Sequence, residues 1–110
     1  MQASEADIQR AVLARISIIP GCVFWRSNTG AAQLGNRYVA FGLRGAADLT
    51  GCIAPFGRRV EIELKTETGR QSEDQKKFQA MIEAVGGLYI LSRDVDSAVD
   101  AVLEAMRNDP

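Results

Sequence analysis

The sequence predicts an α/β fold, a mixed β-sheet flanked by helices, with its elements in the order α-β-β-β-β-α-β-α. Three observations support this prediction: apolar residues recur at helical spacing near both ends, short β-forming runs fill the region between, and a strand, a helix and a strand follow one another from Val60 to Leu91. Such a passage is a crossover unit, which places its two strands parallel in one sheet. A chain of 110 residues is expected to form one domain, residues 1–110.

The first helix is predicted from about Glu5 to Ser17. Ser4 followed by Asp7 has the pattern of a helix N-cap, and apolar residues then recur at helical spacing. The Pro20-Gly21 pair ends this region, because neither residue favours continuation of a helix.

Four β-forming runs follow the first helix. The runs "CVFWRSN" and "NRYVAFG" are separated by the glycine-containing segment "TGAAQLG". The runs "AADLTGCIA" and "RRVEIELKT" are joined by a turn at "PFG" and predict a β-hairpin.

The second helix begins with a capping-box pattern from Ser72 to Gln75 and ends at Gly86-Gly87. The next run, "LYIL", is short and apolar, which is typical of a strand in the middle of a sheet. A last helix is expected to begin near Asp94 or Asp96.

Composition excludes several kinds of chemistry. Histidine is absent, which removes histidine metal sites and nucleophile pairs that need an imidazole base. Cys22 and Cys52 form no CxxC pair, so a buried, reduced cysteine is predicted at each position. The longest apolar run, Ile16 to Trp25, is too short to span a bilayer, so we expect a cytoplasmic protein with no membrane partner.

The net charge of −1 argues mildly against a simple nucleic-acid-binding domain, since such domains are usually basic. The charge is unevenly distributed, however. Residues 21–80 carry nine basic and six acidic side chains, and the two ends are acidic. A cation bound by acids in this middle region would make it more positive still, which would favour contact with a phosphate backbone.

The strand that includes Glu61, Glu63 and Lys65 has a charge at every second position. The plain interpretation is the solvent face of an edge strand. The following helix and apolar strand, however, indicate a covered sheet, where unpaired charges are costly. Asp48 stands alone in an uncharged segment, and the hairpin can bring it alongside Glu63. Two carboxylates on adjacent strands suit magnesium or manganese, and Lys65 would point to the same side.

This pattern, Asp followed by Glu-x-Lys on the neighbouring strand, resembles the PD-(D/E)xK nucleases and, within them, the VRR-NUC domain, the virus-type replication-repair nuclease. The resemblance is carried by "SEADIQRAVL", "GAADL", "EIELKTETGRQSEDQ" and "LYILSRDVD" and covers nearly the whole chain. Its most specific part is "ELKT-x-x-GR-x-S-x-x-Q". The family typically has proline where this chain has Ala47, and more often an apolar residue in place of Glu61. The resemblance implies a restriction-endonuclease-like sheet.

The resemblance also implies a DNA endonuclease that uses Mg²⁺, with Mn²⁺ as a substitute. Asp48 and Glu63 would hold the metal, with the Leu64 carbonyl as a third ligand. Lys65 would orient or deprotonate the attacking water and offset charge on the phosphate.

Two further residues have both a functional and a structural interpretation. By resemblance Glu5 would face the site from the first helix and help to bind metal or water, but a glutamate in a first turn is also favoured by the helix dipole. By the same resemblance Gln75 would lie near the active site, although the capping box explains it as well.

Basic residues after the catalytic strand are candidates for contact with DNA. They are Arg70, Lys76 and Lys77, with Arg44, Arg26 and Asn28 as secondary candidates. A solvated helix face explains the two lysines equally well. Trp25 is more typical of a core or interface residue than of a base-stacking platform.

The resemblance points to branched DNA, such as a Holliday junction, as the substrate of a phage-type replication and repair nuclease. Symmetric cleavage of a junction needs two active sites, so we expect a homodimer. One alternative is a restriction-like or recombination-associated nuclease acting on flaps or linear duplex. Another is a catalytically silent nucleic-acid-binding module, against which the joint presence of Asp48, Glu63 and Lys65 argues.

Overall fold

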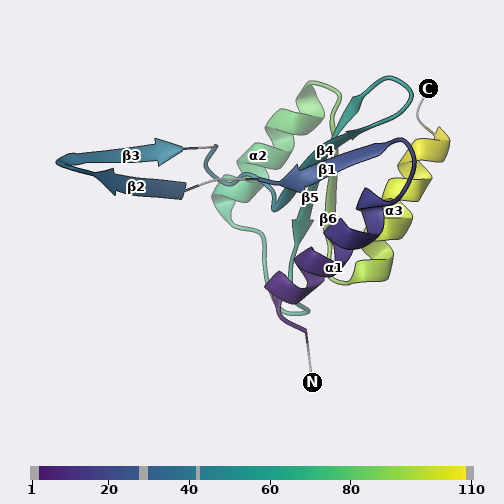
Figure 1. Cartoon of the computed structure of the whole chain (residues 1–110), viewed down its shortest axis with the longest axis horizontal. Helices are drawn as coiled ribbons and strands as arrows, with labels where there is room; N and C mark the ends of the chain where they lie inside the picture. The colour runs from purple at the N-terminus through teal and green to yellow at the C-terminus, as the bar shows by residue number, and fades with distance from the viewer. Residues whose placement is uncertain (1–2, 28–29, 42, 109–110) are drawn as a thin grey trace.

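The computed structural model describes residues 3–27, 30–41 and 43–108 and contains three helices and six strands (Figure 1). In chain order these are α1 (Glu5–Ser17), β1 (Cys22–Arg26), β2 (Gly30–Leu34), β3 (Arg37–Phe41), β4 (Leu49–Ile53), β5 (Arg58–Leu64), α2 (Glu73–Ala84), β6 (Leu88–Ser92) and α3 (Val95–Asn108). No helix within these described ranges has both the length and the apolar character needed to cross a lipid bilayer.

Four strands form one mixed sheet in the order β1-β4-β5-β6. β4 pairs antiparallel with both β1 and β5, whereas β5 and β6 are parallel. β2 and β3 form a separate antiparallel hairpin, which projects away from the body of the molecule (Figure 1).

The predicted fold class and order of elements are confirmed, as are the β4–β5 hairpin and the β5-α2-β6 crossover. The structure adds one strand, β2, inside the segment that the sequence indicated as a connection. Its Gly-Ala-Ala-Gln-Leu sequence has little β propensity, so pairing with β3 defines it. The prediction that "LYIL" lies in the middle of the sheet is wrong, because β6 is an edge strand. Its apolar residues are explained by α2 and α3, which both pack on β6.

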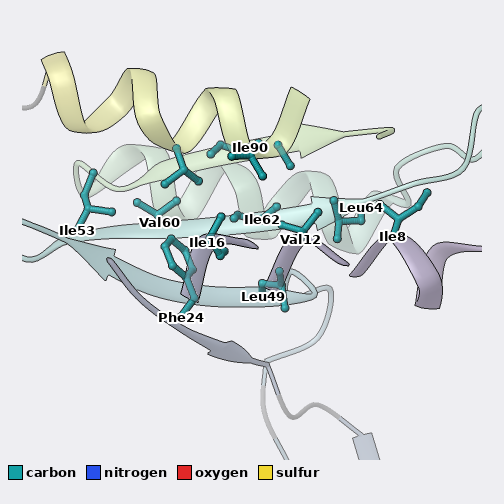
Figure 2. Close-up of a cluster of buried hydrophobic side chains, with 13 residues drawn as sticks. Ile8, Val12, Ile16, Phe24, Leu49, Ile53, Val60, Ile62, Leu64 and Ile90 are labelled. Carbon is teal, nitrogen blue, oxygen red and sulfur yellow. The ribbon is translucent and has the colours of Figure 1, made fainter. Parts of the chain in front are cut away.

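The main hydrophobic core lies between the sheet and the pair of helices α1 and α3. Alternate residues of β5, namely Val60, Ile62 and Leu64, project into it and are fully buried (Figure 2). The helical stripe of α1 and the first half of α3 supply the opposing side chains, which are Ile8, Val12, Ile16, Ala98, Val99 and Val102.

The opposite face of the sheet has a much smaller apolar cluster under α2, made of Ala47, Phe78, Ile82 and Tyr89. Because side chains alternate along a strand, Glu61 and Glu63 belong to this second face of β5. Their residues are only 1% and 2% exposed. The plain interpretation of these glutamates as a solvent face is therefore wrong, since β5 is an interior strand of a covered sheet.

Both cysteines are free and half-buried rather than fully buried, and Cys22 packs against the main core. Cys22 lies at the start of β1, where its Sγ is 3.3 Å from Sδ of Met106. Burial raises the pKa of the Cys22 thiol, as expected for a structural cysteine rather than a reactive one.

Gly45 brings the segment before β4 against the start of α2. Its φ of +78° lies in the left-handed region, and an added Cβ would overlap the backbone carbonyl of Asp74. Only glycine combines this conformation with so close an approach. Gly45 therefore positions the segment that leads to Asp48.

We predict that Gly45→Ala lowers the free energy of unfolding more than Gly57→Ala, a matched control with a φ of +72° and nothing within 4 Å of its added Cβ. Both changes should cost about 1–2 kcal/mol from left-handed backbone strain. Overlap with Asp74 should add about 1–3 kcal/mol at Gly45. Urea denaturation of the two variants measures the difference. Equal losses would show that the Gly45 contact does not constrain the structure.

Candidate metal centre

Hairpin register brings the two central carboxylates together. Leu49 of β4 pairs with Ile62 of β5, and continuing this antiparallel register by one residue sets Asp48 opposite Glu63. Glu5 approaches from the first turn of α1. One carboxylate oxygen from each of these three residues lies within 4.8 Å of the other two. The predicted convergence of Glu5, Asp48 and Glu63 is therefore present in the structure.

Asp48 is held by the backbone of the strand that also bears Glu63. The Leu64 N–H donates a hydrogen bond of 2.8 Å to Asp48 Oδ2, and the Ser27 N–H donates one of 2.9 Å to the Asp48 carbonyl oxygen. These bonds fix both the side chain and the backbone of Asp48. The Leu64 side chain is buried in the main core, so this strand end is anchored on its other face.

Glu63 is a buried carboxylate with an incomplete set of partners. Its Oε2 accepts a hydrogen bond of 3.1 Å from Gln75 Nε2 and lies 3.5 Å from Lys65 Nζ. Among the side chains of the described residues, no hydrogen-bond donor reaches the buried Oε1. Burial, together with the neighbouring Asp48 carboxylate, raises the pKa of Glu63 to about 7, although Lys65 acts in the opposite direction.

These residues fit a hard divalent cation. A buried oxygen without a donor is costly, and so are neighbouring carboxylates that share one site. A cation between Glu5, Asp48 and Glu63 would satisfy the orphaned oxygen and offset the repulsion at once. The donor set is all oxygen, which is the set that magnesium and manganese prefer.

Gln75 belongs both to the helix cap and to the site. Its backbone N–H donates to Ser72 Oγ at 3.1 Å, and its side-chain Oε1 accepts from the Ser72 N–H at 2.8 Å, which completes the predicted capping box. The amide nitrogen left over donates to Glu63. The two interpretations of Gln75 are therefore compatible, because the two ends of one amide serve different partners.

The basic residues predicted to contact DNA lie outside this cluster. Within the described part of the chain, no ion pair joins any of them to the three carboxylates, and all are exposed: Arg26, Arg44, Arg70, Lys76 and Lys77. Arg44 lies 3.9 Å from Asp74, and Lys76 lies 3.3 Å from Glu73. The prediction for Asn28 falls outside the described residues.

Sequence reasoning missed two contributions near the site. Arg93 donates hydrogen bonds to the carbonyl oxygens of Thr66, Glu67 and Gly69, so it fixes the loop that follows Lys65. The second contribution is the buried polar group around Glu61. The glutamate at that position, where the family more often has an apolar residue, was the sequence signal for it. Arg93 offered no signal, because a single arginine after an apolar strand is common on protein surfaces.

Fold and site together define an α/β domain with a carboxylate centre at the end of an interior strand. A solved structure described as a VRR_NUC domain has this fold: its TM-score is 0.62, and the match covers 91% of this chain and 94% of that one at 17% sequence identity. The expected likeness to the VRR-NUC fold is thus confirmed as a likeness of fold. No family model and no curated protein matches the sequence.

We predict that Mg²⁺ or Mn²⁺ raises the melting temperature of the protein, and that Glu63→Gln and Asp48→Asn abolish the increase. A ligand at a hundred times its Kd stabilises the folded state by about 2.7 kcal/mol. Without metal, Glu63→Gln should melt no lower than the wild type, because it removes a buried charge beside another carboxylate. Glu104→Gln on α3 is the control and should respond to metal normally. An undiminished response in Glu63→Gln would exclude this metal site.

We also predict that Gln75→Ala and Ser72→Ala each destabilise α2, by about 1 kcal/mol for loss of a cap. Only Gln75→Ala should weaken metal binding, because only Gln75 also contacts Glu63. Calorimetric titration with Mn²⁺, paired with urea denaturation, separates the two effects. Equal metal affinity in both variants would show that the Gln75 contact does not support the site.

Proposed function

We propose that this protein is a metal-dependent nuclease that hydrolyses phosphodiester bonds in DNA, with Mg²⁺ as the ion and Mn²⁺ as a substitute. One observation carries the proposal: Asp48, Glu63 and Lys65 meet at the end of β5, where Glu63 Oε1 is buried without a donor. The shared fold with a structure described as a VRR_NUC domain supports it, since that name denotes a nuclease.

Each residue of the centre has a distinct task in this proposal. Asp48 and Glu63 hold the ion, with Glu5 and the Leu64 carbonyl as additional oxygen ligands. A bound divalent cation lowers the pKa of water and stabilises charge on phosphoryl oxygens. Lys65 orients or deprotonates the attacking water and offsets charge on the phosphate, and Gln75 keeps Glu63 in place.

The DNA backbone would lie along the start of α2. Lys76 and Lys77 occupy its first turns, and Arg44 and Arg70 lie in the segments before β4 and before α2. The free N–H groups of a helix N-terminus favour a phosphate at the same place. Arg26, at the end of β1, is a more distant candidate.

The substrate that we favour is branched DNA such as a Holliday junction, in a phage-type role in replication or repair. The described part of the chain contains one such centre, and symmetric cleavage requires two. A homodimer would supply the second. Flaps or linear duplex are the alternative substrates, since the same residues would cut either. A silent nucleic-acid-binding module is disfavoured, because such a module has no need of Lys65 beside Glu63.

We predict that wild-type protein with Mg²⁺ cleaves a labelled four-way junction faster than flap, nicked or linear DNA. Lys65→Ala should slow cleavage by about 100-fold or more, the range for loss of a proton-transfer group. Asp48→Asn should abolish cleavage because metal binding is lost. A gel-based time course of the substrate panel measures these rates.

The control is Arg107→Ala, which removes an exposed positive charge paired with Glu104 at the end of α3. It should cut at the wild-type rate. Cleavage that is unchanged in Lys65→Ala would refute the nuclease assignment. Equal rates on all four substrates would refute only the preference for junctions. Symmetric cutting by a protein that gel filtration shows to be monomeric would refute the dimer.

A further inference from the structure

A row of three side chains crosses the sheet beside the metal centre. Trp25 of β1 pairs in register with Thr50 of β4, and Thr50 pairs with Glu61 of β5. All three belong to the face of the sheet on which α2 packs, but α2 packs on β6 at the far edge. The part of this face over β1 is less covered, and Trp25 remains 47% exposed, whereas Thr50 of β4 is buried. Of the two places expected for Trp25, the core is therefore excluded, and an interface is not tested.

Beside Trp25, this face of the sheet contains a cavity of about 240 Å³. Six of the residues that line it are Trp25, Leu43, Thr50, Arg59, Glu61 and Phe78, and we call it the Glu61 pocket. The volume is below the range of about 300–1,000 Å³ for pockets of drug-sized ligands. A single flat ring system is therefore a suitable occupant, and a whole nucleotide is not.

Glu61 gives the pocket a directed acceptor. Its side chain is 1% exposed, and its Oε1 accepts hydrogen bonds from Thr50 Oγ1 at 2.8 Å and Arg59 Nε at 2.6 Å. Both of these hydrogen bonds go to Oε1, so Oε2 is the oxygen that a ligand would engage. A carboxylate oxygen in a pocket wall favours a ligand that brings an N–H group.

We propose that the Glu61 pocket binds one unpaired nucleobase that carries an exocyclic amino group, from the DNA strand whose phosphate lies at the metal centre. The inference rests on the proposed nuclease function. Glu61 and Glu63 are two residues apart on one strand, which separates them by about 6.7 Å. Neighbouring parts of one DNA strand can therefore occupy the pocket and the metal centre together.

The chemistry of the wall discriminates between bases. A carboxylate accepts from the amino group of cytosine, as Glu and Asp do elsewhere in DNA recognition. The ring N–H of thymine lies between two carbonyl oxygens, which the Glu61 carboxylate repels. Trp25 provides an exposed aromatic surface for stacking, and the Arg59 guanidinium, whose side chain is 56% exposed, can donate to a base carbonyl. An unpaired base is required, since a base stacked within a duplex cannot enter a pocket in the protein.

The plain alternative is that Thr50, Glu61 and Arg59 form a structural ion pair and nothing more. Such a pair predicts no preference among bases. The two possibilities can be separated because Trp25 is the only tryptophan in the chain, so intrinsic fluorescence reports directly on the pocket.

The test titrates metal-free wild-type protein in EDTA with short oligo-dC and oligo-dT of equal length, which bind without being cut. We expect saturable quenching of Trp25, with oligo-dC binding about tenfold more tightly than oligo-dT, the discrimination of one good base contact. Glu61→Gln should lose this preference, because its neutral amide no longer repels thymine. Equal quenching by both oligonucleotides, no quenching, or an unchanged preference in Glu61→Gln would overturn the inference.

Two further variants keep the test decisive. If Glu61→Gln does not fold, Thr50→Val takes its place, since it removes the hydroxyl that orients Oε1 and should reduce the preference. Trp25→Ala should weaken binding of both oligonucleotides about tenfold by anisotropy, through loss of stacking. Unchanged binding would count against the inference. Because EDTA prevents cleavage, this result is independent of the nuclease assays: unchanged cleavage in Lys65→Ala refutes the nuclease, whereas absent base preference refutes only the pocket.

Discussion

The structure depends on one constraint, the burial of the Glu63 carboxylate in an interior strand. A buried charge in that position is stable only when hydrogen-bond donors or a cation lie next to it. Lys65 and Gln75 meet this requirement at Oε2, and nothing in the described chain meets it at Oε1. The position of α2 brings Gln75 to this carboxylate, and the hairpin and the loop before β4 place Asp48 beside it.

The two faces of β5 have different roles: one is buried in the apolar core, and the other carries the candidate site. Val60, Ile62 and Leu64 are buried against α1 and α3, and each contributes about 1.5–3 kcal/mol by the usual value for a fully buried aliphatic side chain. The other face carries Glu61 and Glu63, whose burial is costly. The free energy gained by burying the apolar face of β5 therefore offsets the free-energy cost of burying its two glutamates. In the sequence, such a strand shows only alternating apolar and charged residues. The same alternation is typical of a strand with one face in solvent, so the sequence alone does not distinguish the two cases.

The sequence predicted those features that local interactions determine. The bounds of α1, the Ser72–Gln75 capping box and the β4–β5 hairpin depend on neighbouring residues, and hairpin register then places Asp48 opposite Glu63. Features determined by distant packing were not predictable. β2 exists only by pairing with β3, and the exposure of Trp25 depends on how far α2 extends over the sheet. No local signal shows which half of a sheet a helix will cover.

Gln75 makes the metal centre inseparable from the docking of α2. The same side chain completes the helix cap and contacts Glu63, while Gly45 allows the loop before Asp48 to touch the first turn of α2. Any movement of α2 away from the sheet would therefore remove a donor from Glu63 and displace the segment leading to Asp48. A cation bound to both carboxylates would hold the helix start, the loop and the strand in one arrangement. Because the site does not exist in the unfolded chain, the energy of binding a cation there would also be folding energy. Metal binding would therefore stabilise this side of the sheet, where the apolar cluster is small.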